Sequence, residues 1–333
     1  MIKRLFDKYI INALSHMALG LFCSLILGLI VSQLTKIEIF GFLGFVSDIL
    51  SPKSPVVGSA IGLAIAIGLK YPLLVIISSS VVGALGYIFG GPVGSYIAVI
   101  IGAEIGALVS KRTPIDIIIT PLVSIIVGGL VAQLVCPAIN SFMISLGELV
   151  NSATTLNPFF MGLTVSVIVG CCLTLPISSA ALCIMLNLDG LAAGAATAGC
   201  CAQMIGFAVI SYKDNGFGGF VSQGLGTSML QIGNIARKPI IWLAPTLCAA
   251  ILGPISTMVL GMENNSLGAG MGTSGLVGPI AAFTKMTSVG FNTSTTLIEL
   301  AILYFVAPAI ICYVIHLIML KLGWVKAGDM KLL

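Results

Sequence analysis

The sequence predicts an all-α, polytopic integral membrane protein with about eight full transmembrane helices and two or more broken or re-entrant segments. Hydrophobic residues make up 58% of the 333 residues and charged residues only 8%, whereas a soluble domain carries about 25% charged residues. The apolar residues gather in successive runs separated by short links. Two further stretches are rich in Gly, Ser, Thr and Asn but nearly free of charge. A chain with so little charge cannot cover a water-facing surface, so it must lie in a membrane.

The N-terminal half reads as five spans. Lys3, Arg4 and Lys8 precede the first apolar run, and the positive-inside rule therefore places the N-terminal tail, residues 1–8, in the cytoplasm. The first run is too long for the core of a signal peptide, which has about 7–15 residues. A polar link at 36–55 follows it, Gly90-Gly-Pro92 interrupts the later runs, and Lys111-Arg112 marks a cytoplasmic turn. The five spans are predicted at 9–34, 56–69, 73–89, 93–109 and 115–136.

The C-terminal half is less regular. Residues 137–158 contain no Lys or Arg and fit an interfacial segment on the outer face. Lys213, Arg237 and Lys238 indicate that the loop after residue 210 is cytoplasmic, so 159–210 must cross an odd number of times, which leaves one or three passes open. Spans at 239–260 and 297–320 then place the C-terminal tail, residues 321–333, in the cytoplasm. We expect residues 1–333 to form a single transmembrane domain.

Two copies of a short motif lie in the weakly polar stretches. Residues 224–230 and 270–276 both read G-x-G-T-S-x-L, and each copy is followed by a proline. Non-helical backbone is tolerated within a membrane only where protein or a water-filled cavity satisfies its polar groups, and paired broken segments form substrate sites in many transporters. Residues 215–236 and 263–291 are therefore candidate re-entrant segments. The alternative is that the small residues only allow close helix packing.

Several polar side chains are predicted to lie within the membrane. A carboxylate in a span is costly and should face the protein interior, so Glu104 either pairs with another helix or takes part in solute or proton binding. Asp189 is a candidate helix cap, and Lys285 is a candidate counter-charge to Glu263 or a headgroup anchor. The candidate solute-binding residues are Glu263, Asn264, Asn265, Thr273, Ser274, Thr227, Ser228, Glu104, Asn187 and Gln203.

Most enzyme classes find no support in the sequence. There is no P-loop, and the glycines lie in apolar runs without the strand-turn-helix context of a dinucleotide site. The two histidines are widely separated, and the nine cysteines lie in apolar surroundings as small hydrophobes. No spacing resembles a metal site, and no basic cluster suggests nucleic acid. We expect a non-enzyme without a metal or cofactor.

The chain resembles a bacterial membrane family over essentially its whole length, most densely from Asn157 to the C-terminus. It is similar to the IIC-type membrane component of the sugar phosphotransferase system, in the branch of the perfringolysin O regulator protein. The runs that carry this resemblance are LTLPISSA at 173–180, LAAGAAT at 191–197, GCCAQMIG at 199–206, QGLGTSML at 223–230, GAGMGTSGLVG at 268–278 and GWVKAGDMK at 323–331.

The resemblance implies a homodimeric permease in which re-entrant loops hold the solute. Separate IIA and IIB proteins would phosphorylate the sugar, since neither module is fused here, and Glu263 matches best the carboxylate with which such permeases bind sugar. We therefore expect a permease of the bacterial inner membrane that moves a sugar or similar small polar solute by alternating access, without nucleic acid as a partner. The alternatives are a membrane sensor or regulator with the same fold, and an ion-coupled transporter in which Glu104 or Glu263 carries a proton.

Overall fold

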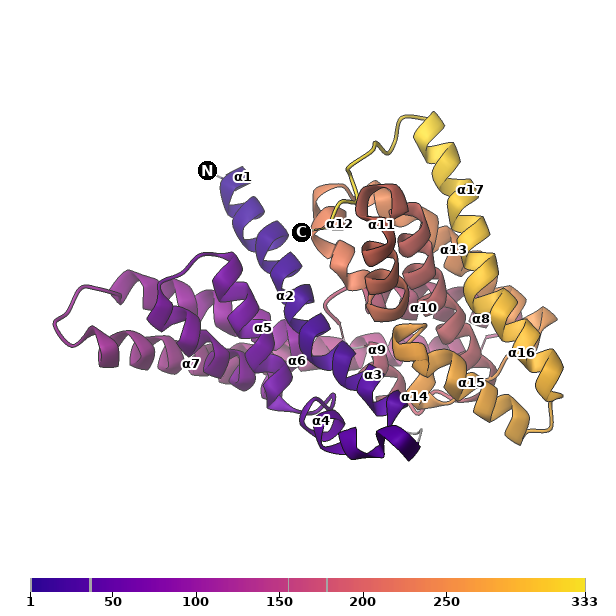
Figure 1. The fold of residues 1–333 in the computed structure, drawn as a ribbon, viewed down its shortest axis with the longest axis horizontal. Coiled ribbons are helices and arrows are strands. Elements are labelled where there is room, and N and C mark those ends of the chain that lie inside the picture. Colours follow the sequence, from indigo (N-terminus) through magenta and orange to yellow (C-terminus); the bar gives the residue numbers. More distant parts are fainter. Residues whose placement is uncertain (1, 36–37, 155, 178, 333) are drawn as a thin grey trace. The chain divides into compact units, whose positions relative to one another are not determined.

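The computed structural model describes residues 2–35, 38–154, 156–177 and 179–332 (Figure 1). Across these residues the regular structure is helical, and the one β-type contact is a bridge between Gly190 and Asn264. The predicted all-α class is thus confirmed. The chain divides into two compact units, Met1–Met143 and Ile144–Leu333, and the boundary falls within a long helix, α7.

The first unit begins with a nearly continuous helix that contains two π-helical turns and reaches Leu34. The predicted polar link at 36–55 contains two short helices where the structure describes it. The predicted interfacial segment after residue 136 instead continues α7, which passes through Pro137. The elements are α1 (Ile2–Phe6), η1 (Asp7–Asn12), α2 (Ala13–Leu21), η2 (Phe22–Ile26), α3 (Leu27–Leu34), η3 (Glu38–Leu43), α4 (Gly44–Ile49), α5 (Pro55–Gly68), α6 (Leu73–Val109) and α7 (Asp116–Thr154).

Helix α6 is in fact a hairpin of two helices. The backbone leaves the helical conformation at Gly90 and Gly91, and Gly91 has a φ of 60° that favours glycine. Beyond this turn the chain folds back, because Ser95 Oγ donates a hydrogen bond of 2.7 Å to the carbonyl oxygen of Gly83. The interruption that Gly90-Gly-Pro92 predicts therefore separates two antiparallel segments, 73–89 and 92–109.

Small residues set the packing of α5 against α6. A Cβ atom on Gly83 would lie 2.2 Å from the carbonyl oxygen of Gly58, and a Cβ on Gly62 would lie 2.1 Å from that of Ser79. Such distances leave no room for a side chain, so the two helix backbones touch. Glycine allows this close approach between membrane helices, in which dispersion and not water exclusion drives association.

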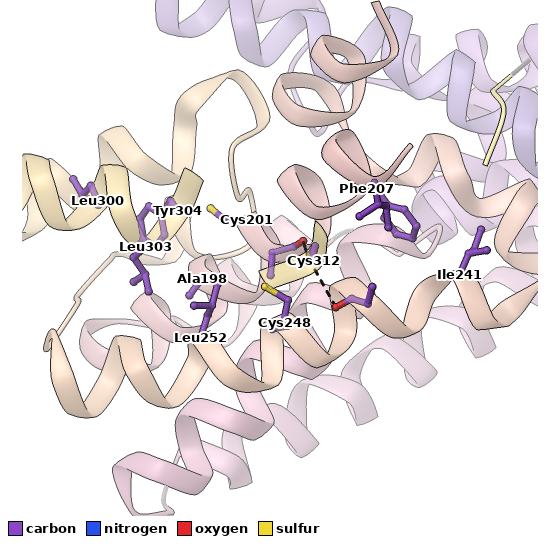
Figure 2. Packing of buried hydrophobic residues seen from close by; sticks show 14 of the residues in the cluster. Ala198, Cys201, Phe207, Ile241, Cys248, Leu252, Leu300, Leu303, Tyr304 and Cys312 are labelled. Carbon is purple, nitrogen blue, oxygen red and sulfur yellow. Dashed lines mark hydrogen bonds between the residues drawn. The ribbon is translucent and has the colours of Figure 1, made fainter. Parts of the chain in front are cut away.

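In the second unit, helix α10 (Gly190–Ile210) is surrounded by the other helices, and 94% of its most apolar stretch of 18 residues is buried. Helices α8, α13 and α17 pack directly on it. Figure 2 shows part of the resulting core, in which Phe207 and Cys201 of α10 lie with Leu252, Leu303 and Tyr304. The helices are α8 (Pro158–Thr174), α9 (Ser179–Met185), α10, α11 (Tyr212–Val221), α12 (Ile232–Arg237), α13 (Leu243–Pro254), α14 (Ser266–Ala269), α15 (Val277–Ser288), α16 (Thr293–Ala301) and α17 (Ala307–Lys321).

The contacts fix the direction of each helix along α10. Helix α8 runs parallel to it, because Gly170 packs on Gly199 and Thr174 bonds to Gln203. The chain then returns through residues 175–189, which include α9, and passes the same way again in α10. Helices α8 and α10 therefore run in the same direction, and the number of membrane crossings within 159–210 stays a prediction.

Helix α13 runs opposite to α8. Ser166 Oγ donates to the carbonyl oxygen of Ala249 at 2.8 Å, and Thr257 Oγ1 donates to that of Pro158 at 2.7 Å. Helix α17 runs parallel to α10, because Cys312 packs on Gly206 and its thiol lies 3.9 Å from the carbonyl oxygen of Ala202. The C-terminal tail therefore leaves α17 at the Ile210 end of α10.

Six described helices are long and apolar enough to cross a membrane, and three shorter apolar helices accompany them. One of the six is the α6 hairpin, which contributes two of the predicted spans. These lengths make the chain a multi-pass membrane protein. The six candidates are Arg4–Ser32, Leu73–Val109, Asp116–Ile139, Gly190–Ile210, Pro239–Val259 and Thr293–Lys321, and the shorter helices are Ile39–Ile49, Pro55–Gly68 and Pro158–Thr174.

The glycine contact predicts a large difference between two similar substitutions in the first unit. Gly83→Ala should lower the free energy of unfolding by about 1–3 kcal/mol, because the added methyl group collides with the backbone of α5. Gly129→Ala in α7 is the matched control, since its Cβ would meet only the flexible end of Leu85 at 3.5 Å. Thermal unfolding in detergent measures both changes. Equal melting temperatures for the two variants would contradict the assigned packing.

Candidate functional site

The second G-x-G-T-S-x-L motif, residues 270–276, packs against the middle of α10. Gly272 has a φ of 53°, and a Cβ there would lie 2.8 Å from Cβ of Cys200, so only glycine suits this position. Cys200 is ten residues from Gly190, which corresponds to about 15 Å along the helix axis. The motif ends at Leu276, a non-glycine residue with a φ of 60°, a strained conformation that clusters at functional sites.

The first motif, residues 224–230, approaches the second from the opposite end of α10. The chain leaves α10 at Ile210, forms α11 and turns back through η4 (Ser222–Gly226). Gly224 then lies beside Ile205 and Ala208 of α10. Thr227 caps the next turn, η5 (Ser228–Gln231), by accepting a hydrogen bond of 3.2 Å from the backbone N–H of Met229.

The two motifs are joined directly by a hydrogen bond. Thr273 Oγ1 of the second motif donates to the carbonyl oxygen of Gly224 in the first, at 2.5 Å. Thr273 is fully buried, and its hydroxyl also lies 3.6 Å from Sδ of Met204. The neighbouring Ser274 is 1% exposed, and its hydroxyl has no hydrogen-bond partner among the described residues. The motif segments thus meet beside Met204 and Ile205 of α10, closer to Ile210 than to Gly190, and the Ser274 hydroxyl next to this point has no partner in the described part of the chain.

Gln203 is the centre of a second buried network. Its Oε1 accepts hydrogen bonds from Trp242 Nε1 at 2.8 Å and from Thr174 Oγ1 at 3.1 Å. Thr174 is in turn hydrogen bonded to Ser228 Oγ at 2.7 Å. Gln203 Nε2 donates to Thr246 Oγ1 at 3.4 Å. Two predicted residues, Gln203 and Ser228, are therefore joined through the end of α8.

Asn264 and Asn265 shape the backbone at the Gly190 end of α10. The backbone N–H groups of Gly190 and Asn264 each donate to the other residue's carbonyl oxygen, at 3.0 and 3.2 Å. The fully buried Asn264 side chain donates to Thr197 Oγ1 at 2.7 Å and to the carbonyl oxygen of Gly278 at 3.1 Å. Asn265 caps α14 by accepting from Leu267 and Gly268 N–H. Both amides hold the second motif segment in place.

Three charged residues gather at this end. Lys285 Nζ lies 2.8 Å from Asp189 Oδ2, and this hydrogen bond raises the pKa of Lys285 above its usual value. Asp189 occupies the N-cap position of α10, but its side chain makes no capping hydrogen bond. Lys285 therefore forms its ion pair with Asp189, and the negative charge of Glu263 contributes to the same rise in the pKa of Lys285. The carboxylate of Glu263 is half-buried, and it forms no hydrogen bond or ion pair with the part of the chain that the structure describes.

Asn187 has a different role. It has a φ of 48°, its side chain is exposed, and its backbone N–H closes the turn after α9 by donating to the carbonyl oxygen of Ile184 at 3.0 Å. Asparagine tolerates this left-handed conformation better than most residues. The side chain itself forms no hydrogen bond with the described residues.

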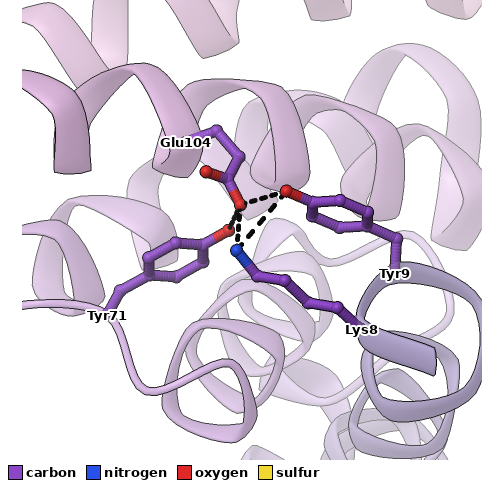
Figure 3. A network of polar contacts seen from close by, with 4 residues as sticks. All are labelled: Lys8, Tyr9, Tyr71 and Glu104. Carbon is purple, nitrogen blue, oxygen red and sulfur yellow. Dashed lines mark hydrogen bonds and ion pairs between the residues drawn. The ribbon is translucent and has the colours of Figure 1, made fainter. Parts of the chain in front are cut away.

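Glu104 belongs to the first unit and has its own partners (Figure 3). Its Oε1 accepts from Tyr9 OH at 2.5 Å, from Tyr71 OH at 2.5 Å and from Lys8 Nζ, which forms an ion pair with it. Burial and the bond to Glu104 raise the pKa of Tyr71, so this phenol remains a donor. These contacts join Glu104 to η1 and to the link between α5 and α6, while its role in solute or proton binding stays a prediction.

The polar groups of this arrangement are mainly amides and hydroxyls, which hydrogen-bond to neutral polar groups. Among the described residues, no group of three or more His, Cys, Asp or Glu could hold a metal ion. All nine cysteines are free thiols, and seven are buried. Sequence reasoning missed Thr174, Thr197, Trp242 and Thr246, which complete the buried networks. The signal that could have found them is a hydroxyl or indole in an apolar helix, because such a buried group needs a hydrogen-bond partner. The signal is weak because it does not say which residue that partner is.

The bond between the motifs can be tested with a near-isosteric pair of variants. Thr273→Val removes the hydroxyl and leaves the buried carbonyl of Gly224 unpaired, which should cost about 1–3 kcal/mol of unfolding free energy. Thr273→Ser keeps the hydroxyl and is the control. Thermal unfolding reports the loss of stability, and faster amide exchange in residues 223–231 locates it. If valine and serine proved equally stable, the two motifs would not depend on this bond.

Comparison with known proteins places the chain in a family. A comparison with curated proteins and one with solved structures each gave no match. The family model described as phosphotransferase system, EIIC, matches residues 11–332, which is nearly the whole chain. The helical membrane architecture agrees with that family. The chain belongs to the EIIC family of the phosphotransferase system, whose members are the membrane components for sugar transport.

Proposed function

We propose that this protein is a permease that moves a sugar or a similar small polar solute across the bacterial inner membrane by alternating access. In this proposal 215–236 and 263–291 are re-entrant segments that enter the bilayer from opposite faces. The observation that carries it is the meeting of the two G-x-G-T-S-x-L motifs beside Met204, within the length of α10. Helix α10 is about 30 Å long, which matches the hydrocarbon core of a bilayer.

The path of the chain supports this depth. Asn264 lies at the Gly190 end of α10, and Gly272 lies about halfway along it. The first motif starts from the Ile210 end and reaches Thr273. Irregular backbone at such a depth requires internal partners, and the hydrogen bonds of Thr273, Thr227 and Asn264 supply them. Similar broken segments bind the substrate in other transporters.

Glu263 is the side chain that we assign to solute binding. It is a half-buried carboxylate at the mouth of the second segment, and its oxygens are free to accept hydrogen bonds from sugar hydroxyls. Asp189, Lys285 and the exposed amide of Asn187 lie at the same end of α10. The free hydroxyl of Ser274 provides a further donor and acceptor deeper along the segment. The remaining predicted residues of the second unit would hold the two motif segments together, and these contacts would break when the site opens. They are Asn264, Asn265, Thr273, Thr227, Ser228 and Gln203.

The charge distribution supports the proposed orientation. Six cationic residues of the second unit lie at or beyond the Ile210 end of α10, and the positive-inside rule places that end in the cytoplasm. The C-terminal tail would then be cytoplasmic, and the cytoplasmic N-terminus follows from its own cationic residues. Phosphorylation would be performed by separate IIA and IIB proteins, and the permease would act as a homodimer. The six residues are Lys213, Arg237, Lys238, Lys321, Lys326 and Lys331.

Solute binding gives the first test of the assignment. A ligand that binds only the folded state at 100 times its Kd raises stability by about 2.7 kcal/mol. A panel of sugars, sugar acids and nucleosides should therefore contain one that raises the melting temperature of the purified protein. Glu263→Gln should abolish this shift and leave the melting temperature without solute unchanged. Glu299→Gln, which alters another half-buried carboxylate, should keep the shift. An undiminished shift in Glu263→Gln would remove Glu263 from the site.

Uptake measurements separate this proposal from its alternatives. The identified solute should enter cells only when the general phosphotransferase enzymes are present, because phosphorylation would trap it. Unimpaired, proton-dependent uptake in cells that lack those enzymes would instead indicate an ion-coupled transporter. Solute binding without any uptake would indicate a sensor, as the resemblance to the perfringolysin O regulator suggests.

A further inference from the structure

The last described residues of the chain form turns at 326–331 and are held by side chains from another part of the sequence. After α17 the chain turns at Gly323 and passes beside α11 and α12, where Val325 and Met330 are each 2% exposed. Five polar side chains contact residues 326–332, which we term the C-terminal strap. These side chains, which we term the polar slot, are Asp214, Asn215, Gln231, Asn234 and Lys238.

The slot binds both the donors and the acceptors of the strap backbone. Asp214 accepts hydrogen bonds from the N–H groups of Gly328 at 2.9 Å and Met330 at 3.3 Å. Asn215 donates to the carbonyl oxygen of Met330 at 2.9 Å and accepts from the N–H of Leu332 at 2.7 Å. A primary amide can donate and accept at once, so a single asparagine here pairs with two peptide groups. The strap is therefore bound mainly through its backbone N–H and carbonyl groups, as a peptide ligand can be.

Buried amides connect the strap to the first motif. Gln231 Nε2 donates to the carbonyl oxygen of Met330 at 2.9 Å and to Gln223 Oε1 at 2.9 Å. Asn234 Nδ2 donates to the carbonyl oxygen of Lys331 at 2.9 Å and to Gln231 Oε1 at 2.8 Å. Gln223 and Gln231 are fully buried and flank residues 224–230 directly. The strap is therefore linked to the first motif by hydrogen bonds through the side chains of Gln231 and Gln223.

We propose that the polar slot is a peptide-binding site whose occupant is the chain's own C-terminal strap, and that the strap positions the first G-x-G-T-S-x-L motif. Gln231 and Asn234 each lose a backbone acceptor when the strap leaves, and a buried amide without partners is costly. Gln223 and Gln231 must then move to reach water, and Gly224, which bonds to Thr273, moves with them. Gln223, Gln231 and Asn234 are thus positioning residues. This inference rests on the contacts alone and does not depend on which solute is carried.

Removing the strap and then returning it as a peptide tests the proposal. In a variant that ends at Ala327, amide hydrogen exchange of residues 224–231 should become at least tenfold faster, while exchange of α13 stays unchanged. A synthetic peptide of residues 323–333 should restore the slow exchange, and a scrambled peptide should not. Lys331→Ala is the matched control, because that residue contributes its backbone carbonyl and its side chain is exposed. Unchanged exchange in the truncated variant, or equal rescue by both peptides, would overturn the proposal.

A second variant covers the case in which the truncated chain fails to fold. Asn215→Asp keeps the acceptor for Leu332 but removes the donor to Met330, and its charge repels that carbonyl oxygen. Exchange at residues 224–231 should then rise by a factor between those of Lys331→Ala and complete removal of the strap. Exchange identical to that of Lys331→Ala would count against the proposal.

The ion pair between Asp329 of the strap and Lys238 of the slot makes the stability of the protein depend on pH. Burial alone would raise the pKa of Asp329, but the hydrogen bonds from Lys238 Nζ at 2.6 Å and from the Lys326 N–H, with both positive charges, bring it below the usual value. Its contribution is therefore complete above the ordinary Asp pKa of about 4 and is lost as the pH falls through the folded-state pKa. The difference in melting temperature between the wild type and Asp329→Asn should shrink on acidification below about pH 4. A constant difference would contradict this ion pair.

Discussion

Backbone that leaves the helical conformation inside an apolar bundle must find a partner for each polar group, and this constraint governs the second unit. Helix α10 satisfies its own backbone and presents small residues to its neighbours. Those small residues let irregular segments come close enough for their hydroxyl and amide side chains to bond to one another. The pairs Thr273–Gly224 and Asn264–Gly190 are the clearest results. Each brings a sequence-distant segment to a defined level along α10.

The polar residues of this unit divide into two groups by their partners. Some have fully buried side chains that are hydrogen bonded to other parts of the chain, such as Gln203, Ser228 and Asn264. Glu263 and Asn187 are more accessible and keep free polar atoms. A permease needs both kinds, because a site must be held in shape and must also leave groups for the solute. We therefore place solute recognition at the accessible group and motif geometry at the buried one.

The sequence predicted features that depend on local pattern. Gly90-Gly-Pro92 marked the turn of the α6 hairpin, where the backbone leaves the helical conformation at Gly90 and Gly91. The repeated motif identified two segments that meet. Contacts between distant residues were beyond such reasoning: nothing local shows that Thr174 bonds to Ser228, or that Asn215 binds Leu332. The continuation of α7 through Pro137 also departs from expectation, because a helix of 39 residues has enough other hydrogen bonds to tolerate one missing donor.

The partners of Glu104 bear on how the protein is made. Lys8, Tyr9 and Tyr71 all precede Glu104 in the chain, so all three leave the ribosome before the carboxylate does. A bare carboxylate is costly to insert into a bilayer. Here Lys8, Tyr9 and Tyr71 are already present when Glu104 is inserted, and Glu104 can enter the lipid as part of a neutralised group. The order of residues along the gene product thus lowers the barrier to biogenesis of the first unit.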